Sequence, residues 1–133
     1  MPRPVTITYR ISPTPAAVAQ TAAQLFATAA SDAVQARGRA RIAISGGITP
    51  EAMFALLADP AQPFLKQIPW DKLDLYWVDE RSVPPTHADS NYRMTNAALL
   101  SKVPLAPENI HRMEGELDPE VAAARYESVI RNS

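Results

Sequence analysis

The 133-residue sequence contains no cysteine, which excludes a disulfide framework, a thiolate nucleophile and a cysteine-ligated metal. Thirteen Lys and Arg stand against fourteen Asp and Glu, so the chain lacks the basic excess needed to bind nucleic acid or anionic membranes electrostatically. No stretch approaches the roughly 20 apolar residues of a membrane span, and the first residues lack the apolar run of a signal peptide. We therefore expect a cytoplasmic, soluble protein without nucleic-acid or membrane partners.

Segments that favour strands alternate along the chain with segments that favour helices. Strands are predicted over 5–11, 41–45, 73–78 and around Ile110, where β-branched and aromatic residues gather. Helices are predicted over 14–37, from Thr49 as N-cap to Ala58, from Ser90 or Asn91 to Leu99, and from Pro119 onward. The first helix is bounded by Pro15 and Gly38, and its expected apolar face consists of Val18, Ala22, Leu25, Ala29 and Ala33.

This alternation predicts right-handed βαβ units and a three-layer α/β/α, Rossmann-like parallel sheet within one domain over residues 1–133. The last helix should place Ala122, Tyr126, Val129 and Ile130 on one face. No further strand follows it, and a parallel sheet is normally shielded on both faces. We therefore expect an incomplete domain, truncated at its C-terminus; a small complete domain is the alternative.

A glycine turn, Ser45-Gly46-Gly47, lies where a predicted strand passes into a predicted helix. Two glycines allow close approach of a ligand to the backbone, and the amides at a helix N-terminus favour an anion such as a phosphate monoester. The hydroxyls of Ser45 and Thr49 are further candidate donors. A tight turn without a ligand is the alternative, and the glycine spacing matches neither the nucleotide P-loop nor the dinucleotide fingerprint.

An acid loop, Asp79-Glu80-Arg81, follows the next predicted strand. In a parallel sheet it would emerge at the same edge as the glycine turn, where open α/β folds bind ligands. Arg81 could clamp phosphate oxygens, and a neighbouring carboxylate could accept a hydroxyl or a proton. A solvated loop with local ion pairs is the alternative interpretation.

The remaining polar and aromatic candidates carry weaker signals. Ser90-Asn91-Tyr92 opens a predicted helix, and simple capping accounts for it as well as ligand binding does. The two histidines lie in no nucleophile or metal motif and are interpreted as surface or packing residues, and the two tryptophans as core or loop anchors; these are His87, His111, Trp70 and Trp77.

Taken together, the segments 42–50, 77–84 and 90–92 resemble 6-phosphogluconolactonases in order and spacing. The resemblance implies hydrolysis of 6-phospho-D-glucono-1,5-lactone to 6-phosphogluconate, the second step of the oxidative pentose phosphate pathway, with a sugar phosphate as ligand and no cofactor or metal. It also implies substrate and phosphate binding by Ser45, Gly46, Gly47, Thr49 and Arg81, an orienting role for Asp79, and supporting positions for Glu80, Ser90 and Asn91.

Enzymes of this kind carry a general-base histidine in a Gly-x-Asp-Gly-His-Thr segment, and no such segment occurs between Met1 and Ser133. General-base catalysis contributes about 10² to 10⁴ in rate, so we expect this polypeptide alone to be inactive or nearly so. A glucosamine-6-phosphate deaminase/isomerase and a non-catalytic sugar-phosphate-binding module are the alternatives. Arg81 and the Val83-Pro84 pair resemble the lactonases more closely than the deaminases.

Overall fold

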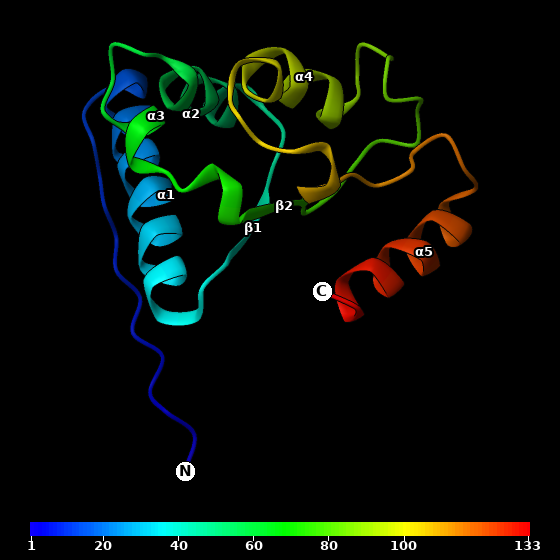
Figure 1. Cartoon of the computed structure of the whole chain (residues 1–133), viewed down its shortest axis with the longest axis horizontal. Coiled ribbons are helices and arrows are strands. Elements are labelled where there is room, and N and C mark those ends of the chain that lie inside the picture. Colours follow the sequence, from blue (N-terminus) through cyan, green and yellow to red (C-terminus); the bar gives the residue numbers. More distant parts are fainter.

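The computed structural model describes all residues from 1 to 133, and its strands and helices alternate as expected (Figure 1). Three 3₁₀ turns connect the longer elements at Trp70–Lys72, Leu100–Lys102 and Pro107–Asn109. The helices and strands are α1 (Pro15–Arg37), β1 (Ala40–Ile44), α2 (Ile48–Ala58), α3 (Phe64–Gln67), β2 (Leu73–Trp77), α4 (Asn91–Ala98), β3 (Ile110–His111) and α5 (Pro119–Arg131). The predicted strands 41–45 and 73–78 correspond to β1 and β2, and their ends differ from the observed ones by no more than one residue.

The three strands form one parallel sheet in the order β1-β2-β3. Ala40 pairs with Leu73 at one end of the β1–β2 ladder, and Ile44 pairs with Trp77 at the other. Because successive side chains of a strand point to opposite faces, alternate residues of β2 belong to two different layers. The predicted α/β class with a parallel sheet is confirmed.

One face of the sheet carries the hydrophobic core, which continues into α1, α2, α3 and the segment after α4. Leu73, Leu75 and Trp77 lie on this face, and both tryptophans are buried, as expected. Asp74 and Tyr76 point to the opposite face, where the Tyr76 hydroxyl lies 2.6 Å from Ser133 Oγ beyond the end of α5. The third layer is therefore α5 alone, which stands on the side of the sheet away from α1 (Figure 1).

The strand predicted over 5–11 does not form. Residues 1–12 are assigned to no helix or strand, and the side chains of Val5 and Ile7 are 88% and 68% exposed. Strand propensity measures how well a residue fits a half-buried pleated surface, and this segment has neither a ladder partner nor a core to cover. Alternation of β-branched residues was therefore an insufficient signal.

The predicted apolar face of α1 is wrong, although both ends of the helix are confirmed by the Thr14 cap and by Gly38 at φ 80°. Val18 and Leu25 are 38% and 44% exposed. The buried stripe consists instead of Ala19, Ala23, Phe26, Ala27 and Ala30. Alanines lie on nearly every side of this helix, so the pattern alone does not select a face, and the large ring of Phe26 together with the small residues beside it does.

The start of α2 also differs from the prediction. Thr49 is not the N-cap: the helix begins at Ile48, with Gly47 as a cap that makes no side-chain hydrogen bond. Gly47 has φ 116°, a conformation that L side chains rarely adopt, and it turns the chain into the helix two residues earlier than predicted. Pro50 is then in the first turn, where its missing N–H costs nothing.

The two later helices begin as expected, with Ser90 capping α4 and Pro119 in the first position of α5. The face predicted for α5 is covered in part only, because Tyr126 is buried whereas Val129 and Ile130 are exposed. This helix touches the sheet mainly through its tyrosine. No helix in the structure combines the length and apolarity that crossing a bilayer would require.

Candidate functional site

The glycine turn and the acid loop meet at one edge of the sheet, because each follows the carboxyl end of a neighbouring parallel strand. They form an open hollow of about 280 Å³, here called the rim hollow. A second hollow of about 250 Å³ lies beside it and extends over Gly47 and the start of α2. Arg81 and Asn91 border both. The residues that line the rim hollow are Ser45, Gly46, Val78, Asp79, Arg81 and Asn91.

The N-terminus of α2 is open toward these hollows. Its cap, Gly47, offers no side-chain acceptor, and the first amides of any helix have no acceptor within the helix itself. The aligned peptide dipoles add positive partial charge at this end. The only acid in the first turn is Glu51, which lines the second hollow. The turn can therefore receive an anion on its backbone amides.

Gly46 is required by a protein contact rather than by its own backbone conformation, since its φ is not positive. A Cβ built at this position would overlap the side-chain oxygen of Asn91 and come within 2.5 Å of its Cγ. The Asn91 amide nitrogen donates to the carbonyl oxygen and to Oδ1 of Asp79, both at 3.2 Å. Asn91 thus packs against the glycine turn and holds the acid loop at the same time.

Glu80 binds the start of α4. Its carboxylate accepts hydrogen bonds from the backbone amides of Asn91 at 2.7 Å and Tyr92 at 3.0 Å, from the Ser90 hydroxyl at 3.0 Å, and from the Arg81 amide at 2.8 Å. Ser90 Oγ accepts in turn from the Arg93 amide at 3.1 Å. The N-terminus of α4 is therefore occupied by the protein's own acceptors, in contrast to that of α2.

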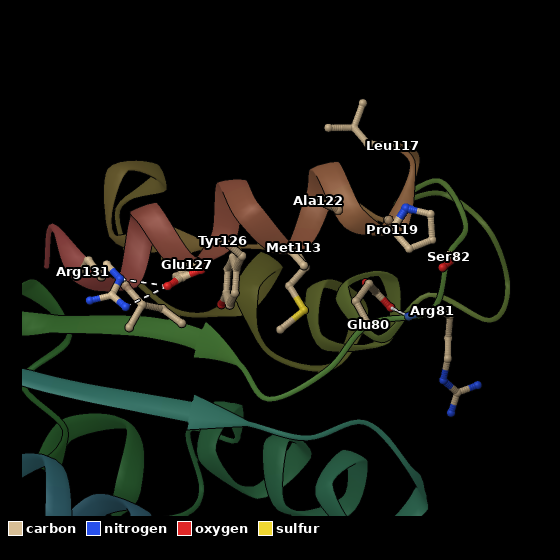
Figure 2. A pocket seen from close by; sticks show the side chains of 13 residues that line it. Glu80, Arg81, Ser82, Met113, Leu117, Pro119, Ala122, Tyr126, Glu127 and Arg131 are labelled. Atoms are coloured by element: carbon tan, nitrogen blue, oxygen red, sulfur yellow. Dashed lines mark hydrogen bonds and ion pairs between the residues drawn. The ribbon is translucent and has the colours of Figure 1, made fainter.

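Arg81 has the opposite environment. None of the chain's ion pairs includes its guanidinium, and its side chain is exposed. Figure 2 shows that this side chain extends away from α5, whereas Glu80 lies on the α5 side of the loop. Consecutive residues of the acid loop thus face opposite directions, and the guanidinium is free to bind an anion at the hollows.

A larger, mainly apolar groove of about 620 Å³ lies between α5 and the acid loop (Figure 2). It shares only Arg81 with the rim hollow. Gly115 lies at its wall, where an added Cβ would come within 2.6 Å of the Val83 carbonyl oxygen. The turn around Gly115 therefore supports the acid loop from behind. The groove's apolar lining suits a hydrocarbon surface better than a phosphorylated sugar.

A second polar cluster lies on the α5 side of the sheet, away from both hollows. Asp74 accepts from Arg39 at 2.7 Å and contacts His111 Nε2 at 3.1 Å, and His111 stacks on Tyr76. Burial raises the pKa of Asp74, but hydrogen bonds from His111 and Arg39 together outweigh it and lower that pKa below its ordinary value. Sequence reasoning missed this cluster because its members come from three separate segments.

The structure brings most of the sequence-predicted site residues together. Ser45, Gly46, Asp79, Arg81 and Asn91 line the rim hollow, and Gly47 and Ser90 line the hollow beside it. Thr49 lines neither, so a contact between its hydroxyl and a ligand stays a prediction. The two histidines line neither hollow: His87 is exposed and binds the Asp89 amide, and His111 belongs to the Asp74 cluster.

Comparison with known proteins gives one family over nearly the whole chain. Residues 13–133 match the family described as glucosamine-6-phosphate isomerases/6-phosphogluconolactonase. The 6-phosphogluconolactonase of Nostoc sp. is 36% identical over 121 residues, which are 90% of this chain and 48% of that protein. The 6-phosphogluconolactonase of Treponema pallidum is 42% identical over 89 residues, which are 67% of this chain and 36% of that protein.

A solved structure shares the fold. The crystal structure of 6-phosphogluconolactonase from Thermotoga maritima superimposes with a TM-score of 0.75 at 27% identity, over 86% of this chain and 50% of the other. The chain spans half or less of the length of each of these relatives.

Proposed function

The chain belongs to the glucosamine-6-phosphate isomerase/6-phosphogluconolactonase family, and we propose that its two hollows bind the substrate of a 6-phosphogluconolactonase, 6-phospho-D-glucono-1,5-lactone. The observation that carries the proposal is the meeting of an uncapped helix N-terminus with an unpaired guanidinium at one edge of the sheet. Such a pair is suited to a phosphate monoester. The residues of this edge and the family of the chain both support a sugar phosphate as the ligand.

The phosphate is assigned to the start of α2. Amides of the turn at Gly47 and Ile48 supply donors without a side chain in the way, and Arg81 adds a planar, charged fork from the other side. Two acids, Glu51 and Asp89, border the same hollow, so the arginine charge is needed to keep the local potential favourable to an anion. Removing Arg81 should therefore weaken binding more than removing any other basic residue.

The ring hydroxyls are assigned to the rim hollow. Asp79 Oδ1 accepts a hydrogen bond from Asn91 at 3.2 Å, and the other carboxylate oxygen has no partner within the protein, so it can accept from a ligand hydroxyl. Asn91 and Ser45 complete the polar lining. In the hydrolysis, a water activated by a general base would attack the lactone carbonyl, and the ring oxygen would leave after protonation.

These residues are assigned binding and orienting roles, and the general base is assigned to none of them. Neither histidine of the chain lines a hollow, so neither can reach a water there. We expect the 133-residue polypeptide to hydrolyse the lactone about 10² to 10⁴ times more slowly than the Nostoc sp. 6-phosphogluconolactonase. A lactonase assay at equal concentrations, corrected for spontaneous hydrolysis, tests this. Equal rates would show that the base lies within residues 1–133 after all.

Binding is tested by calorimetric titration of the chain with 6-phosphogluconate, the stable product. Gluconate and inorganic phosphate serve as truncated ligands, and both should bind at least tenfold more weakly. Arg81→Ala should lower the affinity for 6-phosphogluconate about tenfold or more, because a charge-assisted fork is lost. Arg37→Ala removes the same charge from an exposed position at the end of α1 and is the matched control. Equal affinities for the two variants would contradict the assignment.

The family description also names glucosamine-6-phosphate isomerases, and this alternative is separated by the same titration. A lactonase site should prefer 6-phosphogluconate to glucosamine 6-phosphate. The reverse preference, accompanied by ammonia release from the amino sugar, would favour the deaminase. A binding module would be favoured if a longer family member bound 6-phosphogluconate but did not hydrolyse the lactone. The cytoplasmic location expected from the sequence belongs to the same proposal and is tested by cell fractionation.

A further inference from the structure

Glu80 is the most heavily hydrogen-bonded side chain at this edge of the sheet. Three backbone amides and one hydroxyl donate to its two oxygens, from Arg81, Ser90, Asn91 and Tyr92. The side chain is half-buried and does not line the rim hollow or the hollow beside it. All four of its donors are groups of the protein, so it has little capacity left for a ligand.

These contacts connect the acid loop to α4. Glu80 accepts from the amides that the first turn of α4 would otherwise leave without acceptors, as a side-chain N-cap does, but from a loop ten or more residues earlier. The negative charge also complements the positive end of the α4 dipole. The position of α4 relative to β2 is thereby fixed at the level of individual backbone atoms.

Three residues that border the hollows depend on this attachment. The Asn91 amide is bound directly, and the Asn91 side chain then reaches the Asp79 oxygens and the face of Gly46. The Arg81 amide donates to the same carboxylate, which turns the loop so that the guanidinium leaves on the opposite side (Figure 2). Loss of Glu80 would therefore release Asp79, Arg81 and Asn91 at once.

We propose that Glu80 is a positioning residue of the sugar-phosphate site: it holds Asp79, Arg81 and Asn91 in one arrangement without touching the ligand. The proposal rests on the proposed function and adds to it that the three residues of the acid loop have different roles. Asp79 and Arg81 face the ligand, and the residue between them faces the protein.

The test compares Glu80→Gln with the unaltered 133-residue chain. Glutamine keeps the size of the side chain but replaces one acceptor oxygen with a donor that opposes the backbone amides. We expect at least a tenfold loss of affinity for 6-phosphogluconate, with a smaller loss in Glu80→Asp. Thr14→Ala removes the cap of α1 at a residue that lines neither hollow, and it should lower stability without changing affinity. An equal loss of affinity in Thr14→Ala would overturn the positioning role.

A double-mutant cycle distinguishes positioning from general stabilisation. If Glu80 acts in part through Arg81, Glu80→Gln should cost clearly less affinity once Arg81→Ala is present than in the unaltered chain, and the loss that remains should come through Asp79 and Asn91. Should the two losses multiply instead, Glu80 does not act through the arginine and the proposal fails. Glu80→Asp, the milder change, can be carried through the same cycle if the glutamine variant does not fold.

A ligand-free measurement separates this proposal from the proposed function. In ¹H–¹⁵N spectra of the chain, the Gly46 amide and the Asn91 side-chain amide should shift in Glu80→Gln, whereas the Thr14→Ala spectrum should change only near α1. If the unaltered chain binds no 6-phosphogluconate, the proposed function fails and these resonances decide alone. Shifted signals support the positioning role, and unmoved signals overturn it.

Discussion

Gly46→Ala is the most incisive single change that the structure suggests, because it adds one methyl group against one identified side chain. The new Cβ would overlap the Asn91 side-chain oxygen and lie within 2.5 Å of its Cγ, where about 3.5 to 4.0 Å is the normal carbon–carbon separation. The backbone at Gly46 has no positive φ, so conformational strain contributes little. The cost should come almost entirely from displacing Asn91.

The magnitude follows from what Asn91 gives up when it moves. Its amide nitrogen makes two hydrogen bonds to Asp79, and the residue is 5% exposed, so the displaced groups are not readily rehydrated. Leaving such groups unpaired costs about 1 to 3 kcal/mol, and overpacking adds about as much. We therefore expect Gly46→Ala to lower the free energy of unfolding by about 2 to 6 kcal/mol.

A double-mutant cycle with Asn91→Ala tests the cause as well as the size. Truncation of Asn91 should itself cost about 1 to 3 kcal/mol, but the added methyl at position 46 should then cost little, leaving a coupling of about 2 kcal/mol or more. Urea unfolding followed by tryptophan fluorescence is a suitable assay, since both tryptophans are buried. Gly38→Ala adds a methyl where nothing lies within 4 Å and is the control for backbone strain, about 1 to 2 kcal/mol. Additive costs in the cycle would refute the contact.

Two further predictions concern the attachment of α5 and the acid sensitivity of the chain. The Tyr126 hydroxyl accepts from the Trp77 amide at 2.8 Å and donates to the His111 carbonyl at 2.8 Å, so Tyr126→Phe should cost about 1 to 3 kcal/mol and speed hydrogen exchange at the Trp77 amide. A hydrogen bond from Arg112 lowers the pKa of Glu116 from 4.5 to about 2. The resulting stabilisation is complete above pH 4.5 and is lost as the pH falls through 2. Glu116→Gln should therefore flatten the dependence of the free energy of unfolding on pH in that window. Near pH 7 the slope of that dependence should be the same in the variant and the unaltered chain.

Much of the fold could be predicted because its boundaries are set by local chemistry. Gly38 ends α1 in a left-handed conformation, Ser90 caps α4, and Pro119 opens α5, and each of these effects depends on a few adjacent residues. The segment over 5–11 and the face of α1 were predicted wrongly, because in both cases the outcome depends on a distant partner. A strand needs a neighbour, and an alanine-rich helix takes the face that its neighbours offer.

The meeting of the glycine turn with the acid loop followed from topology, since parallel neighbours end at the same edge of a sheet. The roles within the acid loop did not follow. Asp79, Glu80 and Arg81 are adjacent in sequence, and nothing in their order indicates that the first contacts Asn91, the second binds a helix end and the third stays unpaired. That distribution depends on where α4 begins relative to β2, which is a property of the packed structure.

The two helix ends at this edge show the same limit most clearly. Judged locally, Thr49-Pro50-Glu51 is the better cap signal, with a hydroxyl, a proline and an acid in order, yet α2 begins without a side-chain cap. The N-terminus of α4, opened by Ser90 alone, is the one that is fully satisfied, because Glu80 arrives from another loop. A helix end can bind a ligand only if the protein has not already filled it. The N-terminus of α2 is available for phosphate because Gly47 has no side chain that could accept hydrogen bonds from the first amides. A substitution that supplies an acceptor there, such as Gly47→Asp, should therefore abolish binding of 6-phosphogluconate in the calorimetric titration, and it should also lower stability because φ 116° is strained for any L side chain.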